Sequence, residues 1–154
     1  MALDLTLVID IGKSHAKLLL VDDSGEVLEQ HGRKNAPVAA PLGYSALDIG
    51  GLTDWICSTL AASRLTRRCA RVVPCTHGAA FVALDDEGLA WPPLDYEFDG
   101  YANQTSALHQ AYQAQRDGFD ATLSPDLPMG LNAARQLRIA VCVRQPQLGM
   151  AAEG

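Results

Sequence analysis

Three short apolar segments near the start of the chain are separated by tight polar turns. Residues Leu5 to Ile11 form an apolar run interrupted by Thr6 and, near its end, by Asp10, and Lys17 to Val21 form a second run. The sequence Asp22-Asp23-Ser24-Gly25 then precedes a third segment, Val27 to Gln30 or beyond, and is typical of a β-hairpin. This order predicts an antiparallel meander. It excludes a Rossmann-type start, which needs a helix between its first two strands.

The segment that follows the meander has helical periodicity. After a loop from Asn35 to Gly43 that contains two prolines, residues Asp48 to Ser63 place their large apolar side chains on one face of a helix. Those side chains are Leu52, Trp55, Ile56 and Leu60. A short strand from Arg71 to Cys75 comes next. A meander followed by a helix and a strand predicts an α/β domain with a mixed sheet, in which the new strand runs parallel to the first.

The remaining chain is less regular. It predicts a strand from Ala79 to Leu84, a hairpin at Asp85-Asp86-Glu87-Gly88, a surface helix from Asn103 to Arg116, and the start of another helix between Leu131 and Leu137.

Composition limits the classes of function. The 154 residues are 48% hydrophobic and carry a net charge of −6, which indicates a globular protein whose surface repels nucleic-acid phosphates. No apolar run approaches the roughly 20 residues of a membrane-spanning helix. The four cysteines form no CxxC pair and no leader-like segment precedes them, so we expect reduced thiols, no zinc site and a cytoplasmic location.

The first candidate site lies between the first two strands. Asp10 comes near the end of a buried strand, and the turn Gly12-Lys13-Ser14 leads into the strand that contains Lys17. Turn amides, a hydroxyl and a lysine can hold phosphate oxygens, and a carboxylate can orient Mg²⁺ through water. An ordinary hairpin with Asp10 capping its turn fits the same residues.

The second candidate site combines two polar segments. Thr76-His77-Gly78 follows the predicted parallel strand, and Asp95-Tyr96-Glu97 comes about twenty residues later. Donors, acceptors and an aromatic wall are what a polyol requires. His77 fits equally well as a structural histidine, and Asp95 and Glu97 as parts of a solvated loop.

Together these segments resemble a known family. Asp10-Ile-Gly12-Lys-Ser14-His-Ala-Lys17 is similar to the first phosphate motif of the actin, chaperone and sugar-kinase ATPases. Thr76-His77-Gly78-Ala79 with Leu94-Asp95-Tyr96-Glu97 resembles the sugar-contact segment of FGGY carbohydrate kinases, and xylulose kinases carry a similar His-Gly pair. Residues Leu127 to Leu137 resemble a further segment of that family.

The resemblance implies a ribonuclease H-like, actin-like ATPase domain whose sheet is flanked by helices. It implies ATP and a small-molecule sugar as substrates, with Mg²⁺ near Asp10, phosphates near Gly12, Lys13, Ser14 and Lys17, and sugar near residues 76–78 and 95–97. The general base of the family lies beyond the last residue of this sequence, so no residue is assigned to that role.

Two departures from the family pattern shape the expected activity. Lys13 stands where many members have Thr or Ser, and the segment from Arg138 to Gly154 replaces an aromatic-rich helix. We therefore expect a partial kinase domain over residues 1–137 and a tail over 138–154 outside the family pattern, as after truncation or a frameshift.

The isolated chain is expected to lack kinase turnover. It is also expected to form a homodimer or larger species through exposed apolar faces on the helix from Asp48 to Ser63 and on the segment from Leu131 to Leu137. The alternatives are an inert or partner-binding fragment and, less favoured by the acidic composition, a ribonuclease H-like nuclease that uses metal ions.

Overall fold

The computed structural model describes residues 4–41, 43–98, 107–127 and 131. The chain divides into two compact units. Unit 1 consists of Met1–Pro37 and Asp48–Gly78, and unit 2 consists of Val38–Leu47 and Ala79–Gly154. Each unit has its own small apolar core.

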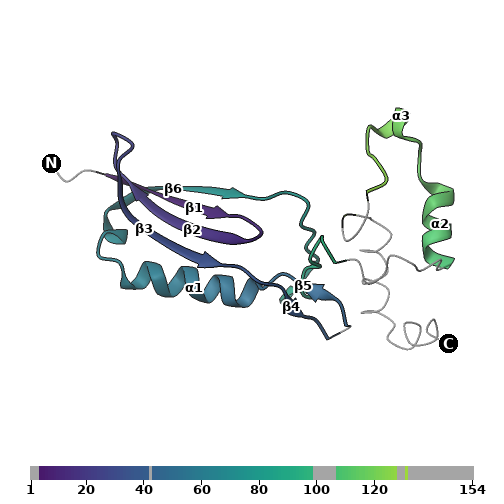
Figure 1. Cartoon of the computed structure of the whole chain (residues 1–154), viewed down its shortest axis with the longest axis horizontal. Helices are drawn as coiled ribbons and strands as arrows, with labels where there is room; N and C mark the ends of the chain where they lie inside the picture. The colour runs from purple at the N-terminus through teal and green to yellow at the C-terminus, as the bar shows by residue number, and fades with distance from the viewer. Residues whose placement is uncertain (1–3, 42, 99–106, 128–130, 132–154) are drawn as a thin grey trace. The chain divides into compact units, whose positions relative to one another are not determined.

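Unit 1 is built on a four-stranded mixed sheet (Figure 1). Strand β2 pairs antiparallel with both β1 and β3, and β6 pairs parallel with β1. The order across the sheet is therefore β3-β2-β1-β6, which confirms the predicted meander and the parallel fourth strand. The bounds are β1 Leu5–Ile11, β2 His15–Val21, β3 Val27–Lys34 and β6 Cys69–Thr76.

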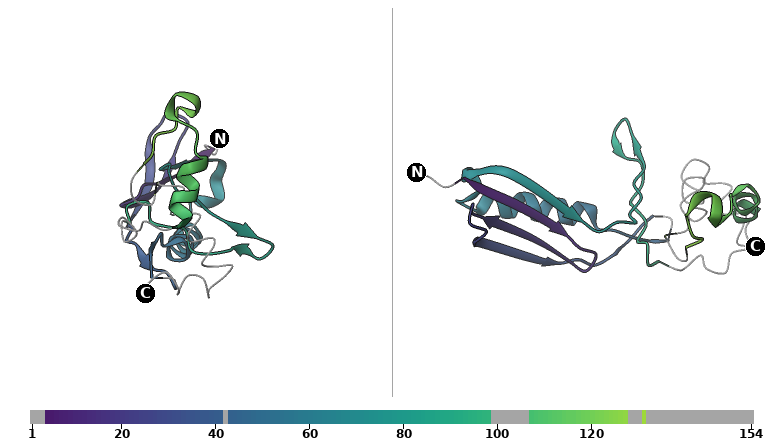
Figure 2. Two further views of the ribbon diagram at one scale, coloured as in Figure 1. Left: turned by 90° about the vertical axis from the view of Figure 1, so that its right-hand side faces the viewer. Right: turned by 90° about the horizontal axis from the view of Figure 1, so that it is seen from above.

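One helix, α1 (Ile49–Ala62), runs along one face of this sheet (Figures 1 and 2). Alternate strand residues point toward the helix, because side chains in a strand have a period of two. Leu7, Leu18 and Leu20 are buried there, and the half-buried Trp55 and Ile56 of α1 pack against them. The apolar face of α1 thus contacts the sheet, so it is not the open face that self-association through this helix would require.

The start of α1 is fixed by Asp48. Its Oδ1 accepts the backbone N–H of Gly51 at 2.9 Å, and its Oδ2 forms an ion pair with Arg33 of β3. The Gly51 N–H, and next the Arg33 guanidinium, lower the pKa of Asp48 below its ordinary value. An aspartate cap suits this position because the first N–H groups of a helix lack partners within the helix.

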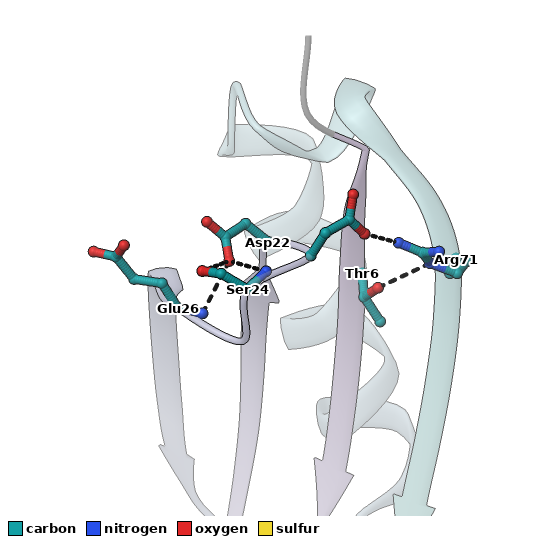
Figure 3. Close-up of polar contacts among 6 residues, drawn as sticks. Thr6, Asp22, Ser24, Glu26 and Arg71 are labelled. Atoms are coloured by element: carbon teal, nitrogen blue, oxygen red, sulfur yellow. Dashed lines mark hydrogen bonds and ion pairs between the residues drawn. The ribbon is translucent and has the colours of Figure 1, made fainter. Parts of the chain in front are cut away.

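The turn that connects β2 to β3 is held by side-chain hydrogen bonds (Figure 3). The Oδ1 of Asp22 accepts hydrogen bonds from the N–H and hydroxyl of Ser24 and from the N–H of Glu26. Gly25 adopts a φ of 87°, which a glycine tolerates without steric cost. Arg71 of β6 reaches across the sheet to the Oγ1 of Thr6 and pairs with Asp23 of this turn.

Unit 2 has shorter elements. Its core consists of Ala40, Tyr44, Ala46 and Leu94, and the Tyr44 hydroxyl donates to the carbonyl of Pro92 at 2.6 Å. Two small antiparallel hairpins and two helices are present in its described part. They are β4 Val38–Ala39 with β5 Ser45–Ala46, β7 Leu84–Asp85 with β8 Gly88–Leu89, α2 Ala107–Gln115 and α3 Phe119–Thr122.

Some predicted boundaries are wrong. The strand expected from Ala79 to Leu84 is confined to Leu84–Asp85, and Ala79 has a φ of 66°, which breaks the extended conformation before that strand. The loop expected from Asn35 to Gly43 contains β4, which pairs with β5.

The other boundaries differ less. The second and third strands are longer than expected, and the 3-10 helix Thr66–Arg68 was not predicted. The helix expected at 131–137 lies, apart from Leu131, outside the described residues, as does the tail at 138–154. Within the described parts of the chain, no helix has the length and apolar character needed to cross a membrane.

Candidate functional site

The candidate phosphate site lies where β1 ends. Asp10 is half-buried, and its register partners are Lys17 on β2 and Cys75 on β6. Because residues in register on adjacent strands share a face of the sheet, this carboxylate has a lysine at one neighbouring position and a thiol at the other. The face is the one opposite α1, since the buried Ala16 and Leu18 flank Lys17 on β2.

A short turn, Gly12 to Ser14, connects β1 to β2. The Gly12 N–H donates to the carbonyl of His15 at 2.9 Å. A Cβ atom added at Gly12 would lie 3.0 Å from that same carbonyl oxygen, so the turn leaves little space for a side chain. The structure thus gives an internal reason for a glycine at this position, the close approach of the His15 backbone.

The Thr76-His77-Gly78 segment lies beside this turn. Ile11 and Thr76 are register partners, and the His77 N–H donates to the Ile11 carbonyl at 3.0 Å. Thr76 Oγ1 donates to the His77 carbonyl, and His77 Nδ1 lies 3.0 Å from the Gly78 carbonyl. Two of the predicted segments therefore meet at the carboxyl ends of the parallel strands β1 and β6, which is where open α/β sheets usually bind ligands.

The third predicted segment, Asp95 to Glu97, belongs to unit 2. Asp95 is 4% exposed, its Oδ1 accepts the Glu97 N–H at 3.0 Å, and its own N–H donates to the Ser45 carbonyl. The solvated-loop interpretation is thus wrong for Asp95, which organises a buried turn, whereas Glu97 is exposed. The grouping of Asp95 to Glu97 with Thr76 to Gly78 in one sugar site stays a prediction.

The residues of unit 1 fit a magnesium–nucleotide. Mg²⁺ prefers oxygen ligands and keeps much of its water, so one half-buried carboxylate such as Asp10 is a suitable anchor. Lys17, which is exposed, supplies positive charge one strand away. No group of three or more His, Cys, Asp or Glu side chains able to hold a metal directly occurs among the described residues.

Sequence reasoning missed one residue at this site, Asn35. Its N–H donates to the Ser14 carbonyl and its side-chain Nδ2 donates to the Gly12 carbonyl, both at 2.8 Å. The available signal was the meander itself, because His15 and Lys34 are register partners and residue 35 therefore falls beside the turn.

Comparison with known proteins shows which solved structures share the fold of this chain. No family model matches the chain, and no curated protein matches it. A carbohydrate kinase from Novosphingobium aromaticivorans is similar over 99% of this chain and 31% of its own, with 34% identity and a TM-score of 0.75. The resemblance to carbohydrate kinases is confirmed.

Other solved sugar kinases share the fold at lower identity. The xylulose kinase from Rhodospirillum rubrum covers 96% of this chain with 18% identity and a TM-score of 0.64. The gluconate kinase from Lactobacillus acidophilus covers 95% with 12% identity and a TM-score of 0.61. The fold is that of sugar kinases of the actin-like ATPase type, and the findings agree with a partial FGGY-like chain. This chain spans 31% of the length of the Novosphingobium kinase, 31% of the xylulose kinase and 30% of the gluconate kinase.

Proposed function

We propose that this chain supplies the first phosphate turn and part of the sugar-contact surface of an ATP-dependent sugar kinase of the FGGY type. The observation that carries the proposal is the meeting of the Gly12–Ser14 turn and the Thr76–Gly78 segment at one end of the parallel strand pair. The similarity to a carbohydrate kinase at 34% identity supports the same assignment.

The roles follow from the chemistry of the side chains. Asp10 would hold Mg²⁺ through water, and bound Mg²⁺ supplies charge neutralisation on the phosphate oxygens. The turn Gly12-Lys13-Ser14 and Lys17 would orient the phosphates of ATP. Residues Thr76 to Gly78 and, from unit 2, Asp95, Tyr96 and Glu97 would contact the sugar hydroxyls.

We further propose that the isolated 154-residue chain does not sustain phosphoryl transfer. The reaction requires an acceptor hydroxyl oriented by a base and a γ-phosphate held in line with it. We assign no residue here to the base or to an adenine pocket. Loss of orientation alone forfeits roughly 7–11 kcal/mol of barrier reduction, which one spare carboxylate does not restore.

The cellular context belongs to the same proposal. ATP is abundant in the cytoplasm, and the three described cysteines, Cys57, Cys69 and Cys75, are free thiols, as a reducing compartment favours. We therefore place the chain in the cytoplasm. The nuclease alternative has no comparable support. A two-metal nuclease needs further carboxylates clustered with Asp10, and no group of three or more His, Cys, Asp or Glu side chains able to hold a metal occurs in the described part of the chain.

Equilibrium binding tests the phosphate site. We expect Asp10→Asn to weaken Mg-ATP binding by about tenfold, which corresponds to ~1.4 kcal/mol. The control is Asp54→Asn, the same change at an exposed position of α1, which should leave the affinity unaltered. Equal affinities for the wild type and the Asp10→Asn protein would refute the assignment of Asp10.

Turnover tests the proposed inactivity. ATP consumption is measured with a panel of pentoses, hexoses, deoxysugars, their ketoses and polyols, and we expect no sugar-dependent rate. Sustained turnover that disappears in Asp10→Ala would show that the chain holds a complete active site. Cleavage of an RNA–DNA hybrid in the presence of Mg²⁺ would instead favour the nuclease alternative.

A further inference from the structure

We propose that Asn35 is a positioning residue for the phosphate turn, holding the Gly12–Ser14 backbone in the conformation that presents its amides to an anion. The proposal rests on the phosphate role given to this turn above. It deepens that role by naming the residue that shapes the site without contacting the nucleotide.

Asn35 holds the turn at two points. Its backbone N–H donates to the Ser14 carbonyl and its side-chain Nδ2 donates to the Gly12 carbonyl, each at 2.8 Å. The third hydrogen bond of the turn, from the Gly12 N–H to the His15 carbonyl at 2.9 Å, closes the loop from within. The residue lies directly after β3, so the meander brings it next to a turn that is more than twenty positions earlier in the chain.

These two contacts determine where the turn amides point. A trans peptide unit is planar, and its C=O and N–H point in opposite directions. The Gly12 carbonyl is directed at Asn35, so the N–H of Lys13, which shares its peptide plane, is directed away from Asn35. The same argument applies to the Ser14 carbonyl and the His15 N–H. The N–H groups of Lys13 and His15, which stand on either side of Ser14 in the chain, are therefore both directed away from Asn35, and backbone N–H groups that point out of a turn can bind phosphate oxygens.

The side-chain amide is held in one orientation. The Gly12 carbonyl accepts only, so the NH₂ group of Asn35 must face it. This leaves Asn35 Oδ1 buried without a hydrogen-bond partner. A buried acceptor without a partner destabilises the fold. The donor contact with the Gly12 carbonyl is therefore made at the expense of an unpaired oxygen on the same side chain.

The alternative is that Asn35 only terminates β3. In that case, replacing it would lower stability but leave the turn amides and anion affinity of the folded protein unchanged. The two roles are separated by measuring the backbone conformation of the turn and the affinity for Mg-ATP at a temperature where every variant is folded.

Three variants and one control test the proposal. Asn35→Ala removes the side-chain donor and keeps the backbone bond, and we expect Mg-ATP affinity to fall about fivefold. Asn35→Asp should weaken binding further, because a carboxylate would face the Gly12 carbonyl and repel phosphate. Asn35→Ser keeps a hydroxyl donor and serves if the alanine variant does not fold. The control is Gln30→Ala, which removes an exposed amide from β3.

The three-bond couplings between the amide and α protons of Lys13 and His15, measured by NMR, report the backbone conformation of the turn independently of nucleotide. Changed couplings in Asn35→Ala, with Gln30→Ala like the wild type, support the proposal. Unchanged couplings at both residues overturn it, as does unchanged Mg-ATP affinity in the alanine and aspartate variants. If the wild-type chain does not bind Mg-ATP, the proposed phosphate role fails, and the couplings alone decide whether Asn35 shapes the turn.

Discussion

Single side chains in unit 1 stabilise its turns in different ways. The Asp22 carboxylate accepts three hydrogen bonds within the β2–β3 turn (Figure 3), whereas the neighbouring Asp23 makes an exposed ion pair with Arg71. Hydrogen bonds from the Ser24 side chain and then from the Glu26 backbone lower the pKa of Asp22. Adjacent aspartates thus have different physical roles, and the sequence pattern Asp-Asp-Ser-Gly does not distinguish them.

A matched pair of substitutions separates these two roles. We expect Asp22→Ala to lower the melting temperature clearly more than Asp23→Ala. The first change leaves turn donors without their acceptor, and the second removes only an exposed ion pair of small value. Thermal unfolding followed by circular dichroism measures the difference. A larger loss for Asp23→Ala would mean that the contact with Arg71 controls the hairpin.

Asp48 gives a prediction about pH. Its pKa in the folded chain is lowered, so its stabilising effect is complete above the unfolded pKa of about 4 and is lost as the pH falls through the folded value. Asp48→Asn keeps a capping side chain but loses the charge paired with Arg33. We expect the free energy of unfolding of the wild type to exceed that of Asp48→Asn by about 1 kcal/mol at pH 7. At pH 3 the difference should be small.

Chemical denaturation at the two pH values measures the Asp48 effect. Asp54→Asn, an exposed change on α1, should show no such pH dependence. A difference between wild type and Asp48→Asn that is the same at pH 3 and pH 7 would exclude a charge-dependent role.

At the scale of elements, the N-terminus of α1 is well defined although the residues there have low helix propensity. The helix begins Ile49-Gly50-Gly51, a poor start by intrinsic propensity. The Asp48 cap and the packing of Trp55, Ile56 and Leu60 on the sheet offset this low helix propensity. Gly51 cannot carry a side chain in this arrangement, because an added Cβ would collide with the Asp48 carboxylate, whereas Gly50 faces open space.

These two glycines make a direct comparison. We expect Gly50→Ala to stabilise the chain by roughly 0.5–1 kcal/mol, as glycine-to-alanine changes in helices do. Gly51→Ala should show no net gain, because the displaced Asp48 carboxylate loses its capping bond. Urea unfolding of both variants measures the contrast. An equal gain at both positions would show that the cap tolerates the methyl group.

At the scale of the whole molecule, the edge strand β6 of the sheet in unit 1 carries exposed apolar side chains. β6 stands at the end of the strand order, and its Val72 and Val73 are 59% and 49% exposed. Val73 is in register with Val8 on the face opposite α1. Edge strands with exposed apolar side chains favour pairing with another chain.

Self-association is therefore expected, as a dimer or larger species. Val73→Lys should shift the chain toward monomer, because a charge on an edge strand opposes pairing between chains. Leu84→Lys, at a 71% exposed position of β7, serves as the control and should have a smaller effect. Sedimentation velocity over a range of concentrations measures the change. A wild-type chain that stays monomeric at high concentration would contradict the prediction.

The sequence by itself determined the meander, α1 and the parallel strand β6. Their periodicities are long enough to outweigh local exceptions, and the glycine and aspartate turns between them are specific. It also identified Asp10, the Gly12–Ser14 turn and Thr76–Gly78 as candidates, since carboxylates, hydroxyls and glycine turns at strand ends are suited to binding phosphate and sugar.

Only the tertiary structure decided which of these residues touch. Strand register placed Thr76 beside Ile11 and brought Asn35 to the turn, and register depends on pairing between strands distant in the chain. The burial of Asp95 depended likewise on Ser45 and on the Tyr44–Leu94 core. The strand expected from Ala79 begins only at Leu84, and the positive φ that interrupts the extended chain at Ala79 is not encoded by an alanine in isolation.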